Sequence, residues 1–234
     1  MSEWKAKRFW KTTSAEAADT GWRVLLDARE VKTPAKAPLR LPTQALAKAI
    51  AAEWDAQEEE IAPLSMPLTR AANAALDKVI PQRDGVIDAL AAYGGTDLLC
   101  YRAEAPPALF QREAAAWDPM LDWAASTLGA RLLPVQGVIP VSQDRKALAA
   151  LRGHLEAASD FELTALHDLV MLSGSLVLGL AVWRGELSGA EAWALSRIDE
   201  EWQAEQWGRD EDADALADAK RAQLLNAERL LELL

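Results

Sequence analysis

The chain has 234 residues, half of them apolar, with a formal net charge of −11 and a pI near 4.8. This length and composition are typical of one large domain or two modest ones with a substantial core, and they argue against global disorder. The acidity argues against a nucleic-acid partner and against docking on anionic lipid, because both require a basic surface. It favours a basic protein partner or simple solubility.

Targeting, membrane and disulfide signals are weak. Cys100 is the single cysteine, so neither an intramolecular disulfide nor a thiolate metal site is expected, which fits a reducing compartment. The first ten residues, MSEWKAKRFW, match neither a signal peptide nor a transit sequence. The apolar run Leu169–Trp183 is too short to cross a bilayer and predicts a buried helix.

Strand signals dominate the chain from Lys7 to Pro42. The strings RFWKTTSA, WRVLLD and AREV predict antiparallel strands, with a tight reversal around Ala28–Arg29. Pro34 and Pro38 then exclude a helix before Pro42. We expect a small antiparallel β unit of about four strands.

Helical patterns follow Pro42 and continue to the end of the chain. Thr43 can cap a helix in which Leu46, Ile50 and Trp54 recur at helical spacing. Further helices are expected over 68–80, over 81–91, and over 109–129 with a restart at Asp118–Pro119. Others are expected from a cap at Ser142 or Asp144 to residue 158, over 160–185, and after a cap at Asp212. The predicted class is α+β, with an N-terminal β domain over residues 1–42 and a larger all-helical domain over residues 43–234.

The stretch Ser188–Asp212 combines three tryptophans with many carboxylates and predicts one helix. Ser188 and Glu191 can form a capping box at its start, and Gly208 can end it. At helical spacing Leu195, Ile198 and Trp202 share one face, which we expect to be buried in the core, whereas Trp193 and Trp207 lie roughly opposite. A helix with two apolar faces is either sandwiched within its own domain or offers one face to another protein.

Catalytic patterns are weak. The best hydrolytic set is His167 and Asp168 with Ser173 or Ser175, but neighbouring helical residues point apart and no Gly-x-Ser-x-Gly elbow is present. We expect His167 to be structural, and the acidic run 210–214 matches no calcium loop. A small hydrolase or lyase that uses carboxylate and histidine chemistry is the alternative hypothesis.

Several strings, in this order, resemble one known family. They are RFW at 8–10, AAEWDAQ at 51–57, MPLTRAANAALD at 66–77, TDLLCYRA at 96–103, WDPMLDW at 117–123 and RIDEEWQAEQWGRDED at 197–212. Together they are similar to the assembly chaperones of F-type ATP synthase that hold the α subunit of the catalytic head before it joins β. The resemblance covers the chain from about Phe9 to Gln223.

This resemblance implies a non-enzyme without cofactor or metal, whose transient partner is the α subunit of F-type ATP synthase. It also implies that the protein binds no nucleic acid or small-molecule substrate and does not insert into a membrane. The family occurs in mitochondria and related bacteria, so without a transit peptide we expect a bacterial cytoplasm, with the mitochondrial matrix after processing as the alternative.

The resemblance also suggests where the partner binds. The acidic-aromatic motif of the family maps onto Asp199, Glu200, Gln203, Glu205, Trp207 and Gly208, and Trp202 replaces a frequent tyrosine. Trp54, Asp55, Arg70 and Asn73 also match, and structural roles are favoured for them. The residues predicted to bind the partner are Arg197, Glu200, Glu201, Glu205 and Trp207.

Overall fold

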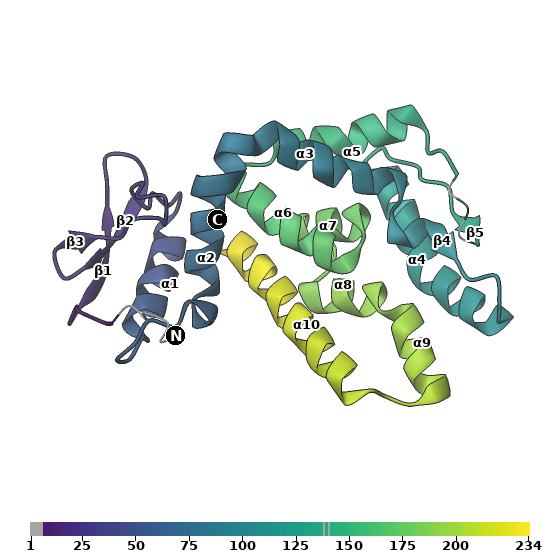
Figure 1. Ribbon diagram of the computed structural model, residues 1–234. Coiled ribbons are helices and arrows are strands. Elements are labelled where there is room, and N and C mark those ends of the chain that lie inside the picture. The colour runs from purple at the N-terminus through teal and green to yellow at the C-terminus, as the bar shows by residue number, and fades with distance from the viewer. Residues whose placement is uncertain (1–6, 138, 140) are drawn as a thin grey trace. The chain divides into compact units, whose positions relative to one another are not determined.

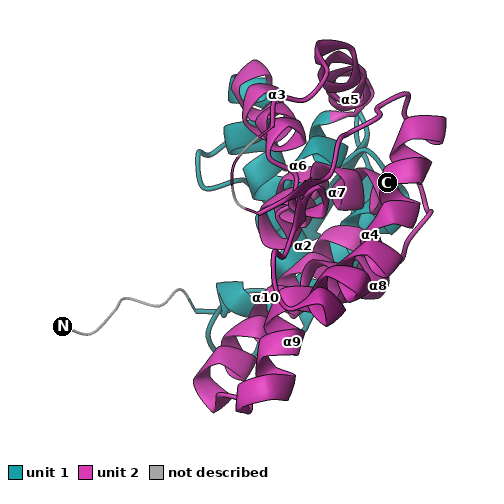
Figure 2. Cartoon of the chain, turned by 90° about the vertical axis from the view of Figure 1, so that its right-hand side faces the viewer, with its two compact units in different colours: residues 1–83, 160–164, 229–234 teal, residues 84–159, 165–228 magenta. Residues whose placement is uncertain are grey.

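The structure, a computed structural model, describes residues 7–137, 139 and 141–234. A three-stranded antiparallel sheet comes first, and the chain after it is mostly helical (Figure 1). The predicted α+β class is therefore confirmed. The chain divides into two compact units (Figure 2). Unit 1 consists of Met1–Arg83, Asp160–Thr164 and Arg229–Leu234, and unit 2 consists of Asp84–Ser159 and Ala165–Glu228.

The sheet of unit 1 consists of β1 (Thr13–Ala17), β2 (Trp22–Leu26) and β3 (Arg29–Glu30). The hairpin of β1 and β2 pairs Thr13 with Leu26 and Ala17 with Trp22. After β3 the described chain forms isolated bridges, such as Lys32 with Pro38, instead of a fourth strand. The expected count of about four strands was therefore wrong, because prolines lack the N–H that a central strand must donate.

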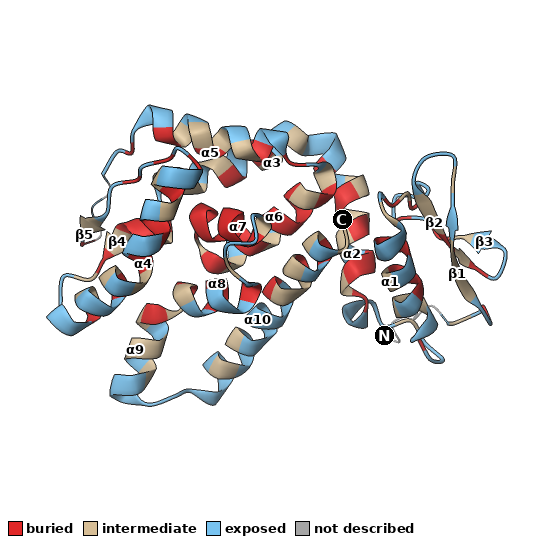
Figure 3. Cartoon of the chain, turned by 180° about the vertical axis from the view of Figure 1, so that it is seen from behind, coloured by how far each residue is buried: buried red, intermediate tan, exposed pale blue. Residues whose placement is uncertain are grey.

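Helix α1 (Gln44–Asp55) packs against β1 and β2. Thr43 caps it as predicted, since its Oγ1 accepts a hydrogen bond from the N–H of Leu46 at 3.1 Å. The buried residues Leu46 and Ile50 alternate with exposed ones along the helix (Figure 3). Trp54 is half-buried, and its ring meets that of Trp10 edge to face, with 5.3 Å between centroids.

The end of α1 also organises the start of α2 (Pro67–Ala74), whose N-cap residue makes no side-chain capping bond. The carboxylate of Glu53 accepts hydrogen bonds from the N–H groups of Leu68 and Thr69, both at 2.7 Å. These donors belong to the first turn of α2, where a negative charge is favourable. Glu53 therefore performs the capping that the local sequence of α2 lacks.

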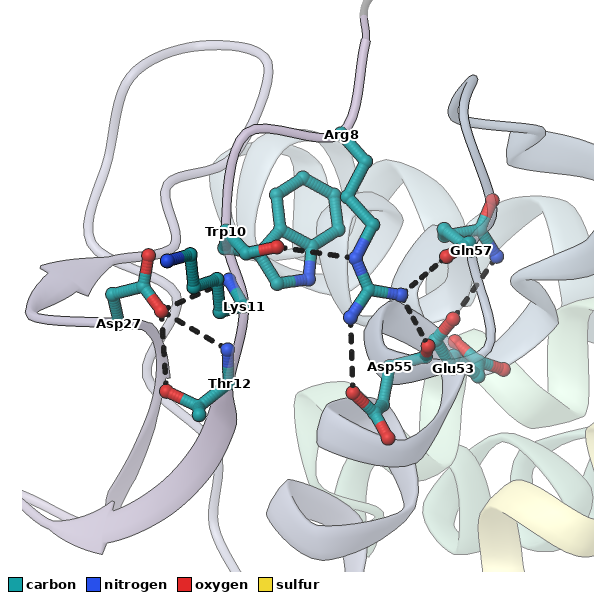
Figure 4. Close-up of polar contacts among 8 residues, drawn as sticks. All are labelled: Arg8, Trp10, Lys11, Thr12, Asp27, Glu53, Asp55 and Gln57. Atoms are coloured by element: carbon teal, nitrogen blue, oxygen red, sulfur yellow. Dashed lines mark hydrogen bonds and ion pairs between the residues drawn. The ribbon is translucent and has the colours of Figure 1, made fainter.

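Arg8 joins the N-terminal segment to the end of α1 (Figure 4). Its guanidinium donates to the carbonyl oxygens of Asp55, at 2.6 Å, and Gln57, and it pairs with the carboxylate of Asp55 at 3.3 Å. Cations are favourable at the C-terminal end of a helix, where carbonyl oxygens have no helical partner. The expected structural role of Asp55 is consistent with this contact. On the sheet side, Asp27 accepts hydrogen bonds from the N–H groups of Lys11 and Thr12, each at 3.0 Å.

The predicted domain boundary at Pro42 stays a prediction. Unit 1 groups the sheet with α1 and α2, and it includes the C-terminal residues 229–234. Within it, the hydroxyl of Thr43 donates to the carbonyl oxygen of Leu233, and Arg83 pairs with Asp160 at 2.6 Å.

The remaining helices and strands follow in chain order. The longer ones are α3 (Arg83–Ala92), α4 (Pro107–Thr127), α5 (Arg145–Ala157), α6 (Asp160–Ser173), α7 (Leu176–Trp183), α8 (Gly189–Ser196), α9 (Ile198–Trp207) and α10 (Glu211–Glu232). Two short strands, β4 (Tyr101–Arg102) and β5 (Val135–Gln136), pair in parallel. Single turns are η1 (Pro63–Ser65), η2 (Ala75–Val79), η3 (Ile80–Gln82), η4 (Tyr93–Gly95) and η5 (Leu98–Cys100).

The apolar run Leu169–Trp183 is mostly buried, as predicted, although Met171 is 50% exposed, and it belongs to two helices. Gly174, with φ of +73°, lies in the break between them, where a residue without Cβ is favoured. Ser175 caps α7 through the N–H of Leu178 at 3.0 Å. The buried carboxylate of Asp97 accepts from the N–H of Val177 at 3.0 Å, so both caps fix where α7 begins.

Two other expected helix ends were wrong. Helix α4 runs through Pro119 without the predicted restart. A proline removes one helical hydrogen bond, and the burial of Trp117 and Met120 on either side outweighs that loss. The cap of α10 is Asp210 rather than Asp212, since Asp210 accepts from the N–H of Ala213 at 2.8 Å.

Candidate partner-binding site

The predicted single helix over Ser188–Asp212 is two helices, α8 and α9. The break lies at Arg197, whose φ of −114° and ψ of 14° are not helical. Its N–H bonds the carbonyl oxygen of Ala194 three residues back, rather than four. The capping box is confirmed, because Ser188 Oγ accepts from the N–H of Glu191 and Glu191 accepts from the N–H of Ser188. Gly208 ends α9 with a φ of 92°.

The break also changes which side chains are buried. Trp193 and Ile198 lie in the core, whereas Leu195 and Trp202 are half-buried. The expectation that Leu195, Ile198 and Trp202 form one buried face was therefore wrong for two of them, because the helical phase shifts at the break. The carbonyl oxygen of Leu195 accepts a hydrogen bond from the indole Nε1 of the buried Trp117 at 2.8 Å.

Most predicted partner-binding residues lie on or beside α9 and form exposed ion pairs. Arg197 pairs with Glu200 at 2.6 Å, and Glu201 pairs with Arg209 at 2.6 Å. Glu205 accepts two hydrogen bonds from Arg112 of α4, at 2.7 and 2.9 Å. Exposed pairs of this kind contribute about 0–1 kcal/mol to the free energy of folding, so the ion pairs of α9 stabilise the fold little.

Trp207, the last residue of α9, is 79% exposed. Among the described large apolar side chains, Leu64 at 85% and Ile139 at 78% are comparably exposed. Tryptophan is enriched at interface anchor positions, where its large ring is buried by a partner. Trp207 is therefore the apolar residue of this site that is most available to another protein.

Near the start of α9, Asp199 lines a cavity of about 430 Å³ in unit 2. Next to it is Glu113 of α4, which is 1% exposed and accepts from the N–H of Ala103 at 2.8 Å. Burial raises the pKa of Glu113 to about 7, and its hydrogen bond with Asp199 adds to the rise. The other residues that line the cavity are Tyr101, Arg102, Ala103, Glu104, Ala105 and Gly137.

Glu113 was not singled out from the sequence, although a signal existed. Leu109, Glu113 and Trp117 recur every four residues, so the spacing places this carboxyl on the buried face of α4. Arg102 was also missed as a buried cation. Its guanidinium donates to the carbonyl oxygen of Leu99, pairs with Asp118 at 2.7 Å and lies over the ring of Trp117 at 4.9 Å.

The groups considered for catalysis make other contacts. His167 lies 3.1 Å from its neighbour Asp168. Ser173 donates to the carbonyl oxygen of Leu169 at 2.6 Å, and Ser175 caps α7. Burial raises the pKa of the Cys100 thiol to about 12, so it is a poor nucleophile. These contacts give no support to the hydrolase or lyase alternative.

The described residues contain no group of three or more histidine, cysteine or acidic side chains suited to a metal ion. None of their helices is both long and apolar enough to span a membrane.

Comparison with known proteins identifies the family. Residues 7–125 match the family model described as ATP12 chaperone protein. The protein atp12, mitochondrial, of Schizosaccharomyces pombe is 25% identical over 221 residues, which cover 88% of this chain and 75% of the yeast protein.

Solved structures extend the match to nearly every residue. The crystal structure of Atp12 from Paracoccus denitrificans is 56% identical, with a TM-score of 0.96 over 99% of both chains, and a mutant of that protein matches equally well. A protein from Agrobacterium tumefaciens is 42% identical, with a TM-score of 0.93 over 97% of this chain and 85% of its own. As the motifs indicated, the chain belongs to the ATP12 chaperone family.

Proposed function

We propose that the protein is a holding chaperone in the assembly of F-type ATP synthase, which binds the unassembled α subunit until it joins β. It works by a stoichiometric cycle of binding and release, without catalysis. The observation that carries this proposal is family membership, given by the family model over residues 7–125 and by 56% identity to a solved Atp12 over 99% of the chain.

The α9 surface suits such a cycle. We propose that Arg197, Glu200, Glu201, Glu205 and Trp207 bind the α subunit. An unassembled subunit exposes apolar interface area that aggregates while unpaired, and an exposed tryptophan can cover part of it. Carboxylates around such an anchor favour specificity and rapid association over raw affinity, and release then remains possible.

The place of action we propose is a bacterial cytoplasm. Two of the similar solved proteins come from bacteria, whereas the S. pombe relative is named as mitochondrial. The mitochondrial matrix is the alternative, and localisation of a tagged chain in its own cells distinguishes the two.

Co-purification from cells tests the central proposal. The tagged full chain is expected to recover the α subunit but not the finished catalytic head. Recovery of assembled enzyme indicates a permanent scaffold instead, and recovery of no α subunit contradicts the proposal. A tagged chain that carries Trp193→Ala, which removes a buried side chain, serves as a misfolded control for non-specific capture.

A further inference from the structure

Helix α10 packs against its own unit along only part of its length (Figure 3). Leu224 and Ala227 are buried, whereas every residue of the segment 211–223 is exposed or half-exposed. This segment extends about 20 Å along the helix axis. Most of the stability of a protein helix comes from the packing of one face rather than from intrinsic propensity. The exposed half of α10 is therefore a surface that a second helix would stabilise.

One face of this segment has a symmetric pattern centred on Leu216, which is 58% exposed. At about 100° per residue, four other exposed residues lie within about 60° of Leu216 around the helix. They are Asp212, Ala213, Ala219 and Lys220. An alanine stands three residues before Leu216 and another three residues after it. A charged residue stands four residues away on each side, an acid before Leu216 and a base after it.

Such a pattern is complementary to itself when two copies of the helix lie antiparallel. A two-fold axis at Leu216 places Asp212 opposite the partner's Lys220, and Ala213 opposite the partner's Ala219. The small alanines let the two helix axes approach closely. A parallel pair would instead place Asp212 beside the partner's Asp212, and like charges repel. Because the face carries one acid and one base, its charge favours neither a strongly basic nor a strongly acidic protein.

We propose that the exposed half of α10 is a contact between two copies of this chain, paired antiparallel about a two-fold axis at Leu216. Asp214 and Asp218 lie two residues from Leu216, on the opposite side of the helix, so they do not meet in this pair. The contact is short and each copy has a net charge of −11, so the dimer is weak and reversible. At physiological ionic strength, exposed charges more than about 8 Å apart are largely screened. The inference goes beyond the proposed function and does not rest on it.

Analytical ultracentrifugation of the full chain, at physiological ionic strength and increasing concentration, tests this contact. A reversible equilibrium between monomer and dimer is expected. Asp212→Lys places a lysine opposite the partner's Lys220 at two symmetric positions, so it should weaken the dimer by at least about tenfold. Asp218→Lys makes the same change in net charge at an exposed position on the opposite side of α10, and should leave the dissociation constant nearly unchanged. A monomer at every concentration, or equal dissociation constants in the two variants, overturns the proposal.

A mixture of two variants tests the antiparallel register. Lys220→Asp alone should also weaken the dimer, but mixed with Asp212→Lys it should form a heterodimer, because each lysine then faces an aspartate. A mixture that stays monomeric while the unmodified chain dimerises overturns the register. If either variant fails to fold, Leu216→Asp at the exposed centre decides, since two aspartates at the axis should abolish the dimer. Capture of the α subunit is scored separately. Loss of capture in Asp212→Lys with unchanged dimerisation would assign this face to the client and overturn the proposal.

Discussion

Helices α7 and α9 are both short, lie in unit 2 and carry large apolar side chains, yet they differ in burial. Every residue of α7 from Leu176 to Val182 is buried, whereas Ile198 is the buried residue of α9. Buried caps, from Ser175 and Asp97, fix the start of α7. Helix α9 has no side-chain cap and is lined by exposed ion pairs.

The difference separates scaffold from contact surface. The side chains of α7 are enclosed by their own unit, so they contribute to folding and cannot meet another protein. Those of α9 contribute little to folding, and retaining a largely exposed tryptophan there has no benefit that the fold itself explains. Substitutions in α7 should therefore change the free energy of unfolding, whereas substitutions in α9 should mainly change binding to a partner.

The largest expected effect is on the stability of α7. Leu178→Ala removes a fully buried side chain and should lower the free energy of unfolding by about 3 kcal/mol, because the cavity it leaves cannot fully collapse. Chemical denaturation followed by circular dichroism measures this. Leu216→Ala, at an exposed position of α10, is the matched control and should change the value by less than about 0.5 kcal/mol. Similar values for the two variants would show that α7 is not the core we describe.

The second prediction concerns the buried edge of α9, where Glu113 meets Asp199. The pKa of Glu113 in the folded protein, about 7, lies above its ordinary value of 4.5. The folded state therefore binds more protons than the unfolded state between these pH values. The contribution of Glu113 to the free energy of unfolding should therefore be largest below about pH 4.5 and should fall as the pH rises towards 7.

Glu113→Gln tests this dependence, because glutamine keeps an acceptor for the N–H of Ala103 and cannot ionise. The free energies of unfolding of Glu113→Gln and of the unmodified chain, measured from pH 5 to 8, should be most similar at pH 5. They should differ more towards neutral pH, where the variant should be the more stable protein. Glu186→Gln, at an exposed acid, should follow the unmodified chain throughout. Parallel curves for Glu113→Gln and the unmodified chain would contradict the assignment.

How well the sequence predicted these regions depends on how far apart along the chain the interacting residues lie. Local signals predicted the cap at Thr43, the capping box of Ser188 and the burial of most of 169–183. The breaks at Gly174 and Arg197 were missed, because they depend on contacts with distant segments. Asp97 accepts a hydrogen bond from the first turn of α7, and Trp117 donates one to the carbonyl oxygen of Leu195.

The candidate site shows the same division. The carboxylates of α9 were found from the sequence because they are close together in the chain. Their partners were not, since Arg112 lies 93 residues from Glu205. The cavity was missed for the same reason, because Tyr101–Ala105, Gly137 and Asp199 meet only in the folded chain.

A charge reversal on α9 should affect binding much more than folding. Glu205→Lys is expected to weaken capture of the α subunit by about tenfold or more, as for other charges at an interface. It should cost no more than about 1 kcal/mol in stability, because the pair with Arg112 is exposed. A pull-down and a melting curve on the same preparation measure both. Glu186→Lys is the control for a change in net charge alone.

The exchange of both charges, Arg112→Glu with Glu205→Arg, distinguishes two reasons for lost capture. It restores the ion pair between α4 and α9 but keeps the wrong sign on α9. If Glu205 contacts the partner, capture stays weak in the exchanged variant. Full recovery of capture means that the carboxylate only holds α9 in place.

The smallest expected change in stability is at the tip of α9. Trp207→Ala should alter the free energy of unfolding by no more than about 0.5 kcal/mol, because the side chain is 79% exposed and contributes little to the core. If the ring is an anchor for the partner, capture should weaken by about 2 kcal/mol, or roughly thirtyfold. Trp207→Phe keeps an apolar ring and should retain part of the binding. An unchanged affinity in Trp207→Ala, with an unchanged melting curve, would remove the end of α9 from the interface and leave the carboxylates of α9 as the surface to test.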